Sequence, residues 1–168
     1  MIQKKICMVG VFATGKTSLV RQFVFSKFSE RYHSTVGVKI DRKRVTVGDR
    51  EVNMLLWDLE GRDGAQELQT SYLRGASGII YVCDGTRPDT FEQVFELRTL
   101  VDQTVGTVPS VLALNKADLA SEWRIADAQV SENEDSTWHV LRTSAKTGHG
   151  VEEAFLWIAT AMTEDAET

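Results

Sequence analysis

The chain has 168 residues, of which 42% are hydrophobic and 26% charged, and its net charge is −5. This length suits one domain, residues 1–168, and the acidic balance argues against nucleic acid or an anionic membrane as the partner. No apolar run approaches the length of a membrane span, and the N-terminus lacks the apolar core of a signal peptide. Both cysteines lie inside apolar runs, which favours buried thiols and a cytoplasmic location.

Strand-like and helix-like segments alternate along the chain. Apolar runs predict strands at residues 4–10, 37–47, 51–58, 75–85, 110–116 and 138–144, with a hairpin turn at 48–50 between the second and third. Helical spacing predicts helices at 16–28, 89–103, 122–133 and 150–162. The second is amphipathic, with Phe91, Val94, Phe95 and Leu100 roughly on one face. Residues 163–168 form an acidic tail that we expect to fray. The alternation predicts an α/β fold, a mostly parallel sheet with helices on both faces.

The loop after the first strand has the spacing of a phosphate-binding loop. Gly10, Gly15, Lys16 and Thr17 fit G-x-x-x-x-G-K-[ST] between a predicted strand and a predicted helix. Successive backbone N–H groups and the helix N-terminus attract phosphate, and Gly15 lets the backbone come close. Lys16 would reach the β- and γ-phosphates, and the Thr17 hydroxyl would bind Mg²⁺. The loop predicts a nucleoside triphosphate without specifying its base.

Two later loops indicate that the base is guanine. Asn115, Lys116 and Asp118 follow a predicted strand in "LALNKADL". A carboxylate at Asp118 can accept from the ring N–H and the exocyclic amine of guanine, a pair that adenine lacks. Asn115 would tie this loop to the phosphate loop, and the stem of Lys116 would cover the base. In "TSAKTG", the backbone N–H of Ala145 is the candidate donor to the guanine carbonyl.

The motifs "GxxxxGKT", "STVGV", "WDLEG", "SYLRGASGII", "NKAD" and "SAK" occur in one order over nearly the whole chain. The sequence therefore resembles the Ras-superfamily small GTPases, closest to the Rab branch. The resemblance implies a P-loop GTPase (Ras-like) fold with a six-stranded, mostly parallel sheet, five helices, and a switch that distinguishes GTP from GDP.

The resemblance also assigns roles to single residues. Phe28 should lie against the base, and Tyr32 should cover the phosphates. Thr35 matches the first-switch threonine that completes the Mg²⁺ shell, and Asp58 matches the second-switch aspartate near Mg²⁺. Gly61 matches the glycine whose N–H contacts the γ-phosphate. Switching would then be an order–disorder change of these segments on hydrolysis.

The second switch departs from the family pattern D-T-A-G-Q, because it reads "DLEGR". Arg62 stands in place of the glutamine that positions water. A guanidinium has only donors and cannot accept from water as a glutamine amide does. Glu60 places a carboxylate beside the expected γ-phosphate, unless it pairs with Arg62 or a loop lysine.

The phosphate loop departs from the family as well. Phe12 replaces a small residue close to the γ-phosphate and to the path of an arginine supplied by a partner. Its ring either folds outward as a hydrophobic lid or obstructs the catalytic centre. Ala13 replaces a usual glycine, so the turn must tolerate a Cβ.

Two functions stay open at this stage. One is a GTPase switch that hydrolyses GTP slowly, and the other is a GTP- or GDP-binding adaptor with negligible hydrolysis. The catalytic candidates are Arg62, Lys16 and Thr35, and the Mg²⁺ candidates are Thr17, Thr35 and Asp58. The expected nucleotide-binding residues are Gly10, Phe12, Ala13, Thr14, Gly15, Lys16, Thr17, Ser18, Phe28, Tyr32, Thr35, Asp58, Gly61, Asn115, Lys116, Asp118, Ser144, Ala145 and Lys146.

Partners are expected at the two switch segments. Effector, exchange-factor or activating proteins would bind residues 30–40 and 58–75. Trp57, directly before the second segment, either contacts them or packs on the hairpin. Basic residues on the hairpin either protect an exposed sheet edge or recognise an acidic effector; they are Lys39, Arg42, Lys43, Arg44 and Arg50. Without Gly at position two or a C-terminal cysteine, we expect no membrane anchor in this chain. Either a lipidated tail belongs after residue 168, or the protein is a soluble switch.

Overall fold

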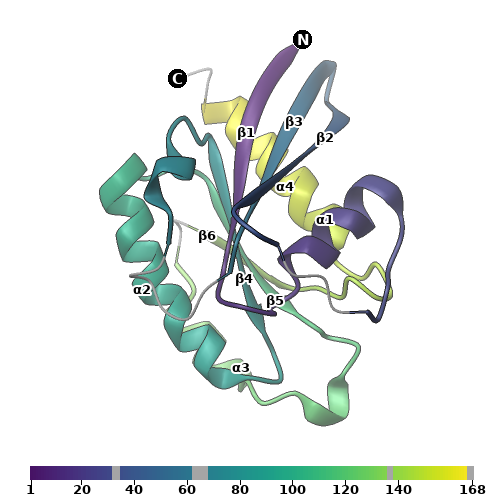
Figure 1. The fold of residues 1–168 in the computed structure, drawn as a ribbon, viewed down its shortest axis with the longest axis vertical. Coiled ribbons are helices and arrows are strands. Elements are labelled where there is room, and N and C mark those ends of the chain that lie inside the picture. The colour runs from purple at the N-terminus through teal and green to yellow at the C-terminus, as the bar shows by residue number, and fades with distance from the viewer. Residues whose placement is uncertain (32–34, 62–67, 136–137, 166–168) are drawn as a thin grey trace.

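The computed structural model of the protein describes residues 1–31, 35–61, 68–135 and 138–165 (Figure 1). The strands are β1 (Ile2–Val9), β2 (Val38–Val47), β3 (Arg50–Leu59), β4 (Gly78–Asp84), β5 (Ser110–Asn115) and β6 (Trp138–Arg142). The α-helices in these ranges are α1 (Lys16–Phe25), α2 (Pro88–Val105), α3 (Asp127–Asn133) and α4 (Val151–Asp165). Two short 3₁₀ segments, η2 (Thr70–Leu73) and η3 (Ala120–Glu122), lie between them.

The strands form one six-stranded sheet in the order β2-β3-β1-β4-β5-β6. All neighbouring pairs are parallel except β2 with β3, which form an antiparallel hairpin. The predicted hairpin turn is confirmed: Gly48 has a φ of 61°, which glycine adopts without the steric penalty of a Cβ. Strand β2 lies at the edge of the sheet and carries most of the basic hairpin residues.

The chain changes direction across the sheet at β1, which has β3 on one side and β4 on the other. Open α/β sheets bind ligands beyond the carboxyl ends of their strands at such a point, because the loops there diverge to opposite faces. Strand β1 ends at Val9, so the loop that begins with Gly10 starts at this position.

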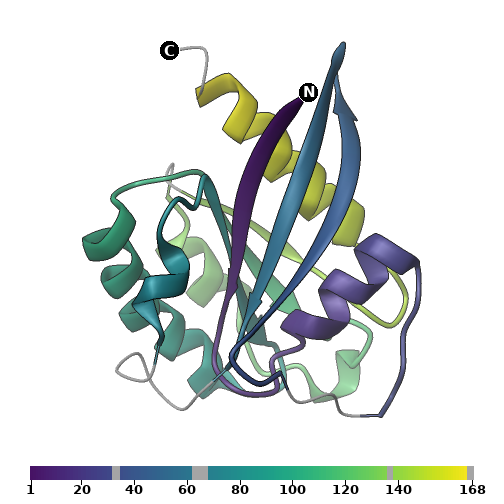
Figure 2. The same cartoon turned by 45° about the horizontal axis from the view of Figure 1, so that its top comes forward.

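Alternate residues of each central strand face opposite layers of helices, as the two-residue period of a strand requires. Ile6 and Met8 of β1 pack in one cluster with residues of α1 and α4, whose Phe23 and Phe155 rings stack at 4.2 Å. Cys7 belongs to the other cluster, with residues of α2 and α3. Figures 1 and 2 show α1 and α4 on one side of the sheet and α2 on the other. The prediction of helices on both faces is confirmed.

The expectation of buried cysteines is confirmed as well. Cys7 and Cys83 are free thiols, and both are buried on the side of the sheet that α2 covers. Burial raises the pKa of the Cys7 thiol to about 12, although Lys5 opposes the shift. Burial also raises the pKa of Cys83. Both side chains therefore act as small apolar core residues at neutral pH.

Two details of the prediction were wrong. Helix α2 buries Leu97 and Val101, while Leu100 is only half-buried, because the core stripe continues at intervals of three and four residues. Helix α4 extends through residues 163–165, since Thr163 is buried and its hydroxyl donates to the Ala159 carbonyl at 3.1 Å. The described ranges contain four α-helices, and η2 lies at the end of the second switch. Residues 62–67 of that switch lie outside the described ranges, so the count of five helices stays a prediction. None of the helices in these ranges is long and apolar enough to cross a bilayer.

Candidate functional site

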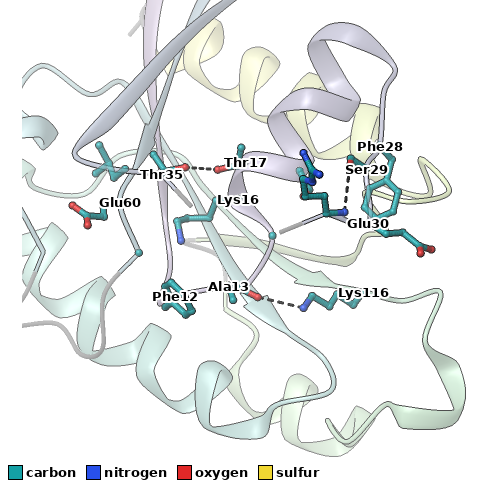
Figure 3. A pocket seen from close by; sticks show the side chains of 15 residues that line it. Phe12, Ala13, Lys16, Thr17, Phe28, Ser29, Glu30, Thr35, Glu60 and Lys116 are labelled. Carbon is teal, nitrogen blue, oxygen red and sulfur yellow. Dashed lines mark hydrogen bonds between the residues drawn. The ribbon is translucent and has the colours of Figure 1, made fainter. Parts of the chain in front are cut away.

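A cavity of about 230 Å³ lies at the carboxyl end of β1 (Figure 3). Its walls come from the phosphate loop, the segment after α1, the first switch, the end of β3 and the loop after β5. The lining residues are Phe12, Ala13, Gly15, Lys16, Thr17, Ser18, Phe28, Ser29, Glu30, Arg31, Thr35, Leu59, Glu60, Gly61 and Lys116. Folding therefore brings most of the expected phosphate and switch residues around one space.

Two glycines of the loop are required by close contacts. A Cβ on Gly10 would lie 2.4 Å from the Val82 carbonyl oxygen. Gly15 has a φ of 101° at the N-cap of α1, and a Cβ there would lie 2.2 Å from Asn115 Nδ2. The loop thus lies directly against β4 and the loop after β5, and its position next to α1 places the N-terminus of that helix at the cavity.

Lys16 presents a buried ammonium group in this cavity. Its Nζ donates to the Gly10 carbonyl at 2.9 Å and to the Val11 carbonyl at 3.0 Å. The residue is only 6% exposed, and burial lowers its pKa to about 8, although the nearby Asp58 opposes the shift and Arg87 adds to it. An anion in the cavity would offset the desolvation cost of the buried Lys16 ammonium group, so the arrangement favours the binding of phosphate.

Three oxygen-bearing side chains from separate segments converge beside Lys16. Thr17 Oγ1 lies 2.6 Å from Thr35 Oγ1 and donates to Asp58 Oδ2 at 2.5 Å, and Thr35 Oγ1 lies 3.3 Å from the same carboxylate oxygen. Asp58 Oδ1 is buried and has no hydrogen-bond partner in the described part of the chain. Burial raises the pKa of Asp58, and hydrogen bonds and Lys16 oppose that shift.

Hydroxyl, carboxylate and water oxygens are the ligands that Mg²⁺ prefers. The convergence of Thr17, Thr35 and Asp58 supplies such oxygens, and Asp58 Oδ1 retains an unused acceptor. A divalent cation would also compensate for the buried carboxylate. The residues therefore fit a Mg²⁺ ion.

The loop after β5 is tied to the phosphate loop as the sequence predicts. Asn115 Nδ2 donates to the Thr14 carbonyl at 3.0 Å, and Asn115 Oδ1 accepts from Thr143 Oγ1 at 3.1 Å. Lys116 has a φ of 73°, and its Nζ donates to the Ala13 carbonyl at 3.3 Å (Figure 3). Asn115 thus joins three segments, the phosphate loop and the ends of β5 and β6.

The expected guanine-binding residues lie next to one another beyond this loop. Asp118 is exposed, and its Oδ1 accepts from Ser144 Oγ at 2.7 Å. Ala145 is buried. Lys146 Nζ pairs with Glu30 at 3.0 Å, which links the β6 loop to the segment that carries Phe28. The exposed Asp118 carboxylate is oriented by Ser144 and remains accessible to a base.

The two switch segments are joined by Glu60. Its Oε2 accepts from the Gly37 N–H at 3.0 Å, and its own N–H donates to the Gly37 carbonyl at 2.8 Å. Sequence reasoning named Arg62 or a loop lysine as the partner of Glu60 and missed this backbone contact. Tyr32 and Arg62 lie outside the described residues.

Gly61 and Phe12 lie next to each other in the wall of the cavity. A Cβ on Gly61 would lie 2.5 Å from Lys16 Nζ and 3.0 Å from the Phe12 Cα, so glycine is needed there. The Phe12 side chain lines the cavity and is 45% exposed. Its ring therefore stands at the cavity edge with one side open to solvent.

Sequence reasoning missed Asp84 and Arg87. Asp84 ends β4, and its Oδ2 pairs with Lys116 Nζ at 2.8 Å and with Arg87 Nε at 3.1 Å. Arg87 Nη2 also donates to the Phe12 carbonyl at 2.8 Å. The available signal was the position of Asp84 directly after a buried parallel strand beside β1, where ligand-site residues gather.

The fold and this cavity define a P-loop nucleotide-binding protein, and comparison with known proteins identifies the family. A Ras family model matches residues 5–164. The chain is 35% identical over 162 residues to Ras-related protein Rab-1 of Theileria parva, covering 94% of this chain and 73% of that protein. It is 33% identical over 157 residues to Ras-related protein Rab-4B of Homo sapiens, covering 90% and 72%. It is 32% identical over 160 residues to Ras-related protein Rab-1C of Dictyostelium discoideum, covering 92% of this chain and 78% of that protein. The chain belongs to the Ras family and is a Rab-like small GTPase.

Proposed function

We propose that the protein is a molecular switch that binds GTP or GDP with Mg²⁺ through a single domain, residues 1–168, and hydrolyses GTP slowly. The observation that carries this proposal is the contact of Thr17, Thr35 and Asp58 within 2.5 to 3.3 Å. These residues come from the phosphate loop and the two switch segments. A Mg²⁺ ion bound to them would make the positions of both switches depend on the nucleotide.

Each side of the cavity has a distinct task in nucleotide binding. Backbone N–H groups of residues 13–18 and the Lys16 ammonium bind the phosphates, because both carry positive potential. Asp118 accepts from the two guanine donors, with Ser144 holding one of its oxygens. Phe28, Lys116 and Lys146 cover the base, and Ala145 donates to its carbonyl.

Hydrolysis is slow in this proposal because two residues act against it. Phosphoryl transfer depends on positioning water and stabilising charge on the transferred group. Lys16 and Arg62 would stabilise that charge, and Thr35 would help to hold Mg²⁺. The Arg62 guanidinium, however, cannot accept from the attacking water. The Phe12 ring stands at the cavity edge, where a partner's arginine would enter.

One observation favours the alternative, an adaptor with negligible hydrolysis. Glu60 holds Gly37 through two hydrogen bonds, neither of which includes a phosphate oxygen. The switches would then keep part of their order after the γ-phosphate is lost. In either case, effector, exchange-factor or activating proteins bind residues 30–40 and 58–75.

Exposed apolar residues support that partner surface. Val36 is 83% exposed and Ile40 is 47% exposed. Ile40 lies opposite Trp57 in the β2–β3 register, and Lys5 Nζ stands 3.6 Å from the centre of the Trp57 ring. Large exposed apolar side chains next to an aromatic ring are typical of protein contacts. The free, buried thiols of Cys7 and Cys83 support a reducing, cytoplasmic location.

The decisive experiment identifies and quantifies the nucleotide in freshly purified protein and then follows its turnover. We expect bound guanine nucleotide, displacement by GDP and not by ATP, and loss of affinity after Mg²⁺ chelation. Single-turnover hydrolysis with and without candidate activating proteins separates the slow switch from the adaptor. Equal affinity for ATP and GTP would contradict the proposed nucleotide specificity.

A further inference from the structure

The carbonyl groups of residues 10–14, in the first part of the phosphate loop, each accept a hydrogen bond from a side-chain nitrogen. The carbonyls of residues 10 and 11 accept from Lys16, and the carbonyl of Thr14 accepts from Asn115. The carbonyl of Ala13 accepts from Lys116, and the carbonyl of Phe12 accepts from Arg87 at 2.8 Å. Five consecutive carbonyls are therefore fixed, and Arg87 is the donor to which the proposed function gives no role.

Asp84 connects two of these donors. Its Oδ2 lies 3.1 Å from Arg87 Nε and 2.8 Å from Lys116 Nζ, while its Oδ1 accepts from the Thr86 N–H and hydroxyl at 2.9 and 2.7 Å. The Asp84 side chain is only 2% exposed. Burial alone would raise the pKa of Asp84, but the hydrogen bonds from Lys116 and Thr86 outweigh burial and lower it. The carboxylate is thus ionised and rigidly held at neutral pH.

Ala13 lies between the two carbonyls that Arg87 and Lys116 hold. Its φ is 61°, in the left-handed region that disfavours residues with a Cβ. A non-glycine residue persists there only when its surroundings fix the backbone on both sides. The contacts at Phe12 and Ala13 fix the peptide groups before and after this residue.

We propose that Asp84 and Arg87 form a clamp that holds Ala13 in its left-handed conformation and thereby positions the Ala13 N–H toward the nucleotide phosphates. This inference rests on the proposed function. In a trans peptide the carbonyl and N–H point in opposite directions. The Phe12 carbonyl is bound to Arg87, which lies outside the cavity lining, so the N–H of the same peptide points toward the cavity.

The Arg87 guanidinium should also make the Ala13 N–H a stronger hydrogen-bond donor. A cation at the Phe12 carbonyl polarises the peptide group, and hydrogen bonds in a chain strengthen one another in this way. The Ala13 N–H would therefore bind an anionic oxygen more strongly when Arg87 is in place. Arg87 and Asp84 are positioning residues, because they reach the phosphates only through the loop.

A double-mutant cycle between positions 13 and 87 tests the clamp. Wild type, Arg87→Gln, Ala13→Gly and the double variant are loaded with a fluorescent GDP analogue, and the dissociation rate is measured. Arg87→Gln should accelerate dissociation about tenfold, the loss expected for a charge-assisted hydrogen bond. With Ala13→Gly the acceleration should fall below about threefold, because glycine adopts the left-handed conformation unaided.

Two further variants make the test specific. Arg87→Lys should not restore the rate, because an ammonium cannot span both Asp84 Oδ2 and the Phe12 carbonyl as a guanidinium does. Arg124→Gln removes the same charge from an exposed position and should leave the rate unchanged. Full recovery with lysine would overturn the bridging role of Arg87.

The four proteins of the cycle are also unfolded in urea without nucleotide. Arg87→Gln should lower the denaturation midpoint more when residue 13 is the native alanine than when it carries the Ala13→Gly substitution. Additive effects of the two substitutions in both measurements would overturn the clamp. If wild type binds no guanine nucleotide, the proposed function fails, and the urea measurement alone then decides for or against the clamp.

Discussion

Lys16 should make both the stability and the nucleotide affinity of the protein depend on pH, in opposite directions. Burial lowers its pKa from 10.5 to about 8 in the folded protein. Each unit of pKa corresponds to about 1.4 kcal/mol, so holding the charge there costs on the order of 3 kcal/mol. A phosphate beside the ammonium group would recover much of this free energy on binding.

The direction in which stability changes with pH follows from the number of protons bound by the folded and unfolded protein. Between pH 8 and 10.5 the unfolded chain keeps the Lys16 proton while the folded, nucleotide-free protein loses it. The free energy of unfolding should therefore rise with pH across this window. Cys7 acts in the opposite direction above pH 9, because its pKa is raised from 9.0 to about 12 in the folded protein. Subtracting the profile of Lys16→Met, which keeps both thiols, isolates the lysine.

Nucleotide affinity should change with pH in the opposite direction. Phosphate raises the pKa of Lys16 again, so GDP binding above pH 8 takes up a proton, and affinity should fall by up to about tenfold per pH unit. Calorimetry in buffers of different ionisation enthalpy measures that proton uptake directly. Urea unfolding of wild type and Lys16→Met at a series of pH values measures the stability term. Parallel unfolding profiles, together with no proton uptake on binding near pH 9, would refute the reasoning.

Three further predictions concern specificity, metal and rate. Asp118→Asn should weaken the binding of GTP and strengthen the binding of xanthosine triphosphate, in which a carbonyl replaces the exocyclic amine. Competition binding measures the two affinities, and an unchanged ratio would mean that Asp118 does not contact the base. Thr17→Asn should impair GTP binding more than GDP binding at saturating Mg²⁺, because a Mg²⁺ ion held by Thr17 would neutralise more phosphate charge in GTP; titration with both nucleotides measures the two affinities, and equal losses would argue against Thr17 as a metal ligand. Arg62→Gln combined with Phe12→Gly should raise single-turnover hydrolysis above either single change. If Arg62→Gln instead lowers the rate, the arginine acts as an internal source of positive charge.

The phosphate loop and the "NKAD" segment could be predicted from sequence because their chemistry is local. In each, a few consecutive residues follow a strand, and the strand's end places their backbone at the edge of the sheet. The alternation of apolar runs was sufficient for the sheet and its two helical layers. The apolar stripe on α2 was assigned wrongly at one position. Val101, and not Leu100, continues the three- and four-residue spacing of Phe91, Val94 and Leu97, so this error lay in reading the helical period.

Contacts between distant segments required the tertiary structure. The pairing of Glu60 with Gly37 and the clamp from Asp84 through Arg87 to the Phe12 carbonyl join residues 23 to 75 positions apart. Their formation depends on how β3 and β4 flank β1, which places the ends of these strands at one edge of the sheet. Sequence showed that Ala13 must tolerate a Cβ in the phosphate loop. Only the fold showed that Arg87, after β4, and Lys116, after β5, donate to the carbonyls of the peptide groups on either side of the Ala13 Cα. Strand order in the sheet, and not spacing along the chain, decides which of these segments become hydrogen-bond partners.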